Sequence, residues 1–145
     1  MKSAFFVLAI LIGFGGLTGC SQSSSLEPVT GKVRVEGKPA RGAMVMFHTD
    51  GPANIRSTPA TATVGDDGSF TMATGVLGGV KPGRYLATVV WPDPNVKLTD
   101  AQRMMGASLS DAPDLLKGRY ATRETSGLAV EIKPGINVLE PFDLK

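Results

Sequence analysis

The residue with the most distinctive chemistry in this chain is Cys20, the single cysteine among 145 residues. One thiol cannot close a disulfide within its own chain, and an unpaired thiol is a liability in an oxidising compartment. Cys20 follows a long apolar stretch, residues 3–17, and precedes the polar stretch SQSSS, residues 21–25. Its chemistry therefore depends on what these two neighbouring segments are.

The first segment has the layout of a secretory signal peptide. Met1 and Lys2 give a positive start, the run SAFFVLAILIGFGGL follows, and no acidic residue occurs before Glu27. A charged start, an apolar centre and small residues at the end are typical of a cleaved export signal. The apolar run is shorter than the roughly 20 residues of a membrane-spanning helix. Residues 1–19 are therefore predicted to be a signal peptide.

The end of this segment, Leu17-Thr18-Gly19-Cys20, resembles a bacterial lipobox. The resemblance implies cleavage before Cys20 and attachment of a diacylglycerol to its sulfur. An ordinary signal peptide with an incidental cysteine is the alternative. Residues 20–27 would then be the lipidated cysteine and a flexible tether, with the membrane as partner. In enterobacterial lipoproteins an Asp after the cysteine retains the protein at the inner membrane. Ser21 therefore favours the outer membrane, with the domain facing the periplasm or cell exterior.

Two other candidates for chemistry have simpler structural explanations. His48 is the only histidine, and a zinc site built by protein usually needs several His or Cys ligands. No G-x-S-x-G segment accompanies His48, so we expect it to be structural. The sequence Asp66-Asp67-Gly68 lacks the remaining ligand positions of a calcium loop and predicts a tight turn. We expect no catalytic residues, no metal and no cofactor.

The charge distribution argues against nucleic acid as a partner. The chain has 15 basic and 13 acidic residues, a formal net charge of +2, and these residues are interspersed. A protein that neutralises phosphates usually concentrates Lys and Arg in one patch or stripe, and no such stripe occurs here.

Residues 28–145, which must position any site, have the sequence pattern of an all-β domain. Short segments alternate between apolar and polar residues and are separated by Gly and Pro turns. In residues 29–35 the valines share one face, and residues 42–48 are apolar on both faces, which predicts a covered or central strand. Residues 61–73 predict a hairpin, with Phe70 and Met72 turned inward. Further strands are expected at 84–91, 128–132 and 137–144, which gives about seven.

The pattern lapses between Trp91 and Gly127. Thr99 and Gln102 fit a capping box that opens a short helix, which Gly106 would end. Leu115 and Leu116 are expected to anchor one further turn. Such long connections are often functional, and the candidate ligand contacts here are Trp91, Met104 and Met105. Trp91 and Tyr85 share a strand face, and their rings either stack on a ligand or fill the core. Met104 and Met105 either form an adaptable contact surface or pack the small helix against the rest of the domain.

Several motifs together resemble the transthyretin-like, carboxypeptidase-regulatory-like sandwich of bacterial lipoproteins. They are GKV at 31–33, GKPARGA at 37–43, VMF at 45–47, DDGSF at 66–70 and KPGRY at 81–85. The chain departs from the pattern at Gly65 and in the insertion 96–110. The resemblance implies a seven-stranded Greek-key (prealbumin-like) sandwich with a short helical insertion.

This resemblance implies a non-enzymatic structural or interaction module of the cell envelope, with envelope proteins or polysaccharide as partners. The alternative is a carbohydrate-binding module that uses Trp91 and the loop 92–126. A hydrolase of the transthyretin-related hydroxyisourate type is more distant, because it would need more than one histidine and a different C-terminal sequence.

Overall fold

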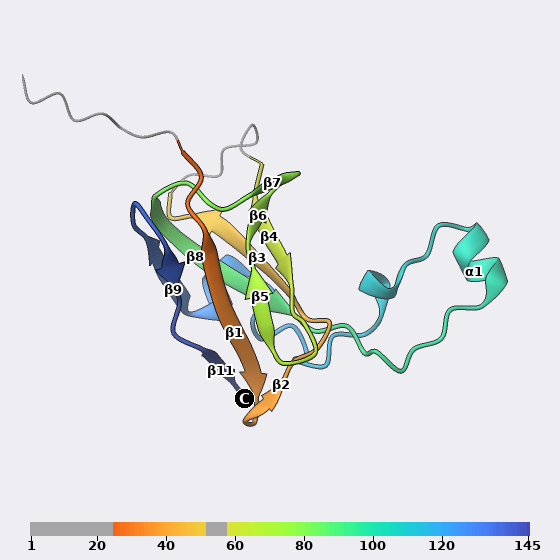
Figure 1. Ribbon diagram of the computed structural model, residues 1–145. Helices are drawn as coiled ribbons and strands as arrows, with labels where there is room; N and C mark the ends of the chain where they lie inside the picture. The colour runs from red at the N-terminus through yellow and green to blue at the C-terminus, as the bar shows by residue number, and fades with distance from the viewer. Residues whose placement is uncertain (1–24, 52–57) are drawn as a thin grey trace, which may run out of the picture.

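The computed structural model describes residues 25–51 and 58–145, so the predicted signal peptide and Cys20 lie outside the described residues. This part of the chain is mostly β, with two sheets and three short helical segments (Figure 1). The strands are β1 (Val29–Val35), β2 (Lys38–Pro39), β3 (Met44–Thr49), β4 (Ala60–Thr63), β5 (Ser69–Thr71), β6 (Ala73–Thr74), β7 (Leu77–Gly78), β8 (Gly83–Val90), β9 (Leu128–Ile132), β10 (Asn137–Val138) and β11 (Phe142–Leu144). The helical segments are α1 (Asp100–Met104), η1 (Leu109–Asp111) and α2 (Arg123–Ser126). No helix in these two ranges is long and apolar enough to cross a membrane.

The smaller sheet is organised around β1, with which each of its other strands pairs. On one edge β1 bonds in parallel to β10 and β11, and on the other it bonds antiparallel to β5 and β2. The inward valines Val29 and Val33 are fully buried, as their alternation predicts. The predicted last strand, residues 137–144, is divided into β10 and β11, with Pro141 between them. Proline has no N–H for the ladder, which accounts for the interruption.

The larger sheet is antiparallel throughout, in the order β7-β6-β4-β3-β8-β9. β3 is central, as predicted, and its Val45 and Phe47 side chains are buried. Its outward face is only partly covered, since Met44 there is 38% exposed. α2 contacts β8 and covers only the part of this face around Thr88.

The predicted hairpin at residues 61–73 forms only at its two ends. Ala60 and Thr61 pair with β6, and at the tip the N–H of Gly65 donates to the Ser69 carbonyl at 2.7 Å. Between these ends the strands separate, because β5 pairs with β1 of the other sheet. The turn prediction itself is confirmed: Gly68 has φ +82°, a value that glycine adopts at little cost.

The pair Pro82-Gly83 of the KPGRY motif also predicts a turn, and this prediction is wrong in the type of turn. The sequence Pro82-Gly83 fits a type II turn, whose second central residue has φ near +80°. Gly83 instead has φ +152° and begins β8. The strand that follows ends at Val90, one residue before the prediction.

The two sheets meet in one apolar core, in which Phe70 of β5 lies beside Gly31. Phe70 is 4% exposed, and its register partner on β1 is Gly31. A Cβ added at Gly31 would lie 2.5 Å from the Phe70 Cζ atom, so the ring fills the space that the glycine leaves. The Phe70 ring also stacks on Phe142 of β11, with ring centroids 6.0 Å apart. The Phe70 ring thus packs across β1, against Gly31 on that strand and against Phe142 on β11, which pairs with β1.

We predict that Gly31→Ala destabilises the domain by about 1 to 3 kcal/mol, because the added methyl group overpacks a closed core. Chemical unfolding of the variant measures this change. Gly78→Ala is the matched control, since Gly78 also lies in a strand and nothing lies within 4 Å of an added Cβ there.

A double-mutant cycle with Phe70→Leu tests the cause of the effect. The shorter side chain gives the alanine room, so the cost of Gly31→Ala should fall by about 1 kcal/mol or more in that background. Equal costs in both backgrounds would show that the ring does not set the requirement for glycine.

Candidate functional site

Trp91 lies at the end of β8, at the edge of the core. It is half-buried and packs against the core cluster. Its indole N–H donates to the Arg41 carbonyl oxygen at 2.9 Å, in the turn between β2 and β3. The exposed Arg41 guanidinium in turn pairs with Asp66 at 2.7 Å. Trp91 is therefore fixed by the turn beside it, and its one polar atom has a partner.

The long connection after Trp91 returns to its starting point and forms a closed arm, which we define as residues 92–113. Pro92 bridges to Asp114, and the N–H of Asp93 donates to the Pro113 carbonyl at 3.0 Å. The N–H of Leu115 donates to the Trp91 carbonyl at 2.8 Å. A loop whose ends meet in this way is held at its base and projects as a unit.

Asp114 closes the base of the arm with three charge-assisted hydrogen bonds. Its Oδ1 atom accepts from the backbone N–H groups of Trp91 at 2.9 Å and Leu116 at 3.0 Å, and its Oδ2 atom accepts from Gly118 at 2.8 Å. The sequence did not indicate that Asp114 closes the arm, because its partner Trp91 lies 23 positions away in the chain. Of the two predicted anchors, Leu116 is buried, whereas Leu115 is 44% exposed because the turn directs only one of them inward.

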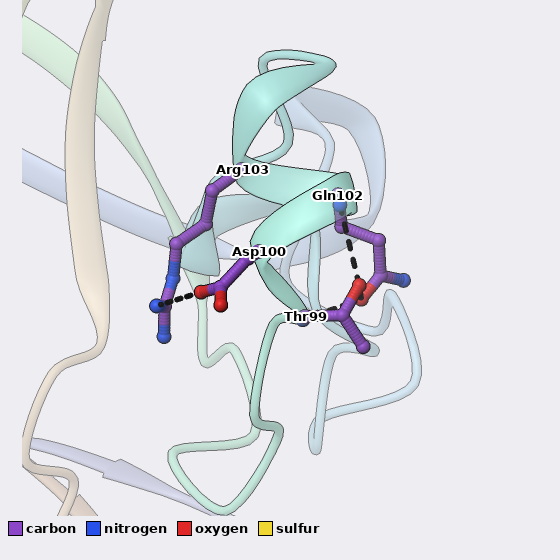
Figure 2. Close-up of polar contacts among 4 residues, drawn as sticks. All are labelled: Thr99, Asp100, Gln102 and Arg103. Atoms are coloured by element: carbon purple, nitrogen blue, oxygen red, sulfur yellow. Dashed lines mark hydrogen bonds and ion pairs between the residues drawn. The ribbon is translucent and has the colours of Figure 1, made fainter.

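The arm carries α1, which is short but complete at both ends. The capping box is confirmed: the N–H of Gln102 donates to Thr99 Oγ1 at 3.2 Å, and the N–H of Thr99 donates to Gln102 Oε1 at 2.8 Å (Figure 2). At the other end the N–H groups of Gly106 and Ala107 donate to the Arg103 and Gln102 carbonyls. This is a Schellman ending, and Gly106 has φ +85° as it requires.

The side chains of α1 face solvent. None of its residues is buried, and Met104 and Met105 are 88% and 87% exposed. Of the two explanations for the methionines, packing of the helix is therefore wrong. Figure 1 shows α1 standing clear of both sheets, at the far end of the arm. The structure does not bring the methionines together with Trp91, which lies at the root of the arm.

The segment after the arm closes the edge of the larger sheet. The N–H of Val89 donates to the Tyr120 carbonyl at 2.9 Å, beyond the point where β9 stops pairing with β8. α2 follows and was not predicted, because it has four residues and its N-cap Thr122 makes no side-chain capping bond. This segment therefore supports the root of the arm from a second side.

His48 lies on the outward face of β3. Its Nε2 atom is 3.0 Å from Thr88 Oγ1 on the neighbouring strand. Burial lowers the pKa of His48, and the nearby Arg123 guanidinium lowers it further, although Glu124 raises it. Within residues 25–51 and 58–145, no group of three or more His, Cys, Asp and Glu side chains could hold a metal ion. A neutral imidazole that bonds a threonine fits the structural role expected for His48.

A hollow of about 540 Å³ lies beside the root of the arm. Its walls come from the end of β1, the turn after Asp114 and the last residue described. The lining residues are Val35, Glu36, Leu115, Leu116, Lys117, Arg119 and Lys145. Arg119 already donates to the Lys145 carbonyl at 3.1 Å. The three cationic side chains and one carboxylate would favour a ligand with anionic groups over a cation.

The arm leaves the domain at the end opposite to the one at which the chain enters. Glu27, before β1, bonds to Val80 in both directions, whereas Trp91 lies beyond the far end of β8 (Figure 1). The predicted lipobox, Leu17 to Cys20, lies before the described residues. The described site is therefore an exposed helix on a closed arm.

Comparison with known proteins gives little further information. No family model matches the chain, and no curated protein matches it. A solved structure that matches is a DUF3823 family protein from Parabacteroides merdae, with a TM-score of 0.37 and 16% identity. The match covers 79% of this chain and 43% of that one, so the chain spans less than half the length of the solved protein.

We predict that Asp114→Ala loosens the base of the arm and destabilises the domain by about 1 to 3 kcal/mol, because it removes an acceptor from three N–H groups. Amide hydrogen exchange should show faster exchange at Trp91, Leu116 and Gly118. Asp114→Asn is the matched control, because it keeps an oxygen at the Oδ1 position and should preserve protection at Trp91 and Leu116 better than at Gly118. Unchanged exchange in the alanine variant would contradict the assignment.

Proposed function

We propose that this protein is a lipid-anchored, extracytoplasmic β-sandwich that acts as a non-catalytic interaction module of the cell envelope. Cys20 carries the lipid, and the arm contacts the partner. The observation on which the proposal rests is the exposure of Met104 and Met105 on α1, a helix with complete caps and no buried residue. The sandwich is proposed to be transthyretin-like, and it acts as the scaffold that holds the arm.

The exposure of two adjacent methionines has a physical cost that contact with a partner would remove. Burying a methionine side chain contributes about 1.5 to 3 kcal/mol relative to leaving it in water. The thioether chain is flexible and polarisable, so it adapts to surfaces of different shape. The caps of α1 keep the methionine backbone ordered before contact, which lowers the entropic cost of binding. We therefore propose a protein of the envelope as the partner.

Polysaccharide is the alternative partner, through Trp91. A sugar-binding tryptophan presents its ring as an open platform, whereas Trp91 is half-buried and its indole N–H is bonded to Arg41. This observation favours the arm over the tryptophan as the contact surface. A pull-down with isolated envelope polysaccharide separates the two, because Trp91→Ala would abolish binding to glycan and Met104→Ser would not.

We predict that Cys20→Ser abolishes lipidation and removes the chain from the membrane fraction, because the thioether-linked lipid requires the cysteine sulfur. Mass spectrometry of the mature chain checks the acyl groups, and carbonate and salt washes check membrane association. Ser21→Ala is the control and should remain lipidated. A Cys20→Ser chain that partitions into washed membranes like the wild type would contradict the anchor.

We predict that deletion of residues 97–110, closed by a short Gly-Ser linker, leaves the domain folded but lowers association with the envelope partner. The loop is closed at its base, and the cost of loop closure changes slowly with length. Thermal unfolding and crosslinking pull-down from cell envelopes measure the two effects.

The double variant Met104→Ser/Met105→Ser gives the sharper form of this test, because it keeps the arm and removes only its apolar surface. Met44→Ser is the control, since Met44 is a partly exposed methionine on the outward face of β3 and lies outside the arm. Equal capture of the wild type and of the methionine variant would show that the arm is not the contact surface.

A further inference from the structure

A second group of exposed apolar side chains lies at the end of the domain where the chain enters β1. Val76 is fully exposed and Leu77 is 62% exposed, both at the tip of the hairpin formed by β6 and β7. Ile136, in the turn between β9 and β10, is 84% exposed. Figure 1 shows that this hairpin and this turn lie at the same end of the sheets. The function proposed for the arm does not use them.

Glu27 binds the entering chain between these two apolar tips. Its N–H donates to the Val80 carbonyl at 2.8 Å and its carbonyl accepts from Val80 at 2.9 Å, which ties it to the strand region after β7. Its Oε2 atom accepts from the Gly135 N–H at 2.9 Å, directly before Ile136. The Ser25 hydroxyl and this N–H lower the pKa of Glu27, so the carboxylate is ionised and already bonded. The folded domain therefore begins at Glu27, with the apolar tips on either side.

Two lysines flank the apolar tips, beside the Glu27 carboxylate that the Gly135 N–H already bonds. Lys81 follows Val80, and Lys133 precedes the turn that carries Ile136; both are exposed. In the part of the chain that the structure describes, neither lysine lies within ion-pair distance of a carboxylate. The nearby Asp50 carboxylate pairs with Arg84 at 3.5 Å. Each lysine near an anionic leaflet contributes about 1 kcal/mol of attraction to its headgroups, and exposed aliphatic side chains beside it can insert below them.

The short connection between Cys20 and the domain indicates which partner this surface contacts. Five residue steps separate Cys20 from Ser25, and an extended chain spans at most about 18 Å over that distance. We propose that Val76, Leu77 and Ile136, with Lys81 and Lys133, form a membrane-contact surface that rests on an anionic lipid leaflet. This inference rests on the proposed lipidation of Cys20, because the lipid holds this end of the domain beside the bilayer.

Spin labelling of the full lipidated chain in vesicles tests the inference. Cys20 is the only cysteine and its sulfur carries the lipid, so a second cysteine can be labelled alone. Three variants are compared: Val76→Cys, Ile136→Cys and, as the control on the arm, Met104→Cys. The vesicles contain phosphatidylglycerol and phosphatidylethanolamine. Collision with oxygen, which concentrates in the bilayer, is measured against collision with a water-soluble nickel chelate.

We expect the labels at positions 76 and 136 to collide more with oxygen and several-fold less with nickel than the label at position 104. Replacing Lys81 and Lys133 by Glu should move the labels at positions 76 and 136 into water, so that they collide less with oxygen and more with nickel. If acylation is confirmed by mass spectrometry and all three labels collide equally with nickel, the membrane-contact surface is overturned while the anchor stands. Spin–spin broadening between labels at position 76 would also overturn it, in favour of a second copy of the chain. An unacylated Cys20 would overturn the anchor and this inference together.

Discussion

The packing of the Phe70 ring on Gly31 is the contact on which the arrangement of the two sheets depends. β5 follows β4 along the chain but leaves it to pair with β1, and the ring enters the one inward position of β1 that has no side chain. Every other strand of the smaller sheet pairs with β1, so this contact holds β5, which continues the chain from β4 of the larger sheet, in the smaller sheet. It also fixes the turn that contains Asp66, whose partner Arg41 holds the indole of Trp91.

Local signals in the sequence predict local structure well here. The capping box of Thr99 and Gln102, the positive φ of Gly68 and the buried alternation of β1 are all as predicted, because each depends on residues a few positions apart. Which strands pair with one another is harder to predict from the sequence. Alternation tells which side of a strand is buried but not which strand lies beside it, so neither the parallel pairing of β1 with β11 nor the departure of β5 from β4 was predicted.

The same limit applies to the site. The sequence predicts α1, but five residues are too few to show whether Met104 and Met105 face a core or water, and only the structure places them in solvent. Asp114 has the type and setting of a turn residue, yet one of its three partners, Trp91, is distant in sequence. Cys20 is the opposite case, since its assignment comes from a local resemblance and concerns residues that the structure does not describe.

The course of β1 from one end of the domain to the other has a mechanical consequence. A membrane anchor would pull at Glu27, and a partner held by the arm would pull at the other end. The neighbours of β1 lie along its length, with β10 and β5 near its start and β11 and β2 near its finish. Tension along β1 would load these hydrogen bonds in shear, so many must break together instead of opening one after another. A domain loaded in this way would transmit force between its two ends without unravelling.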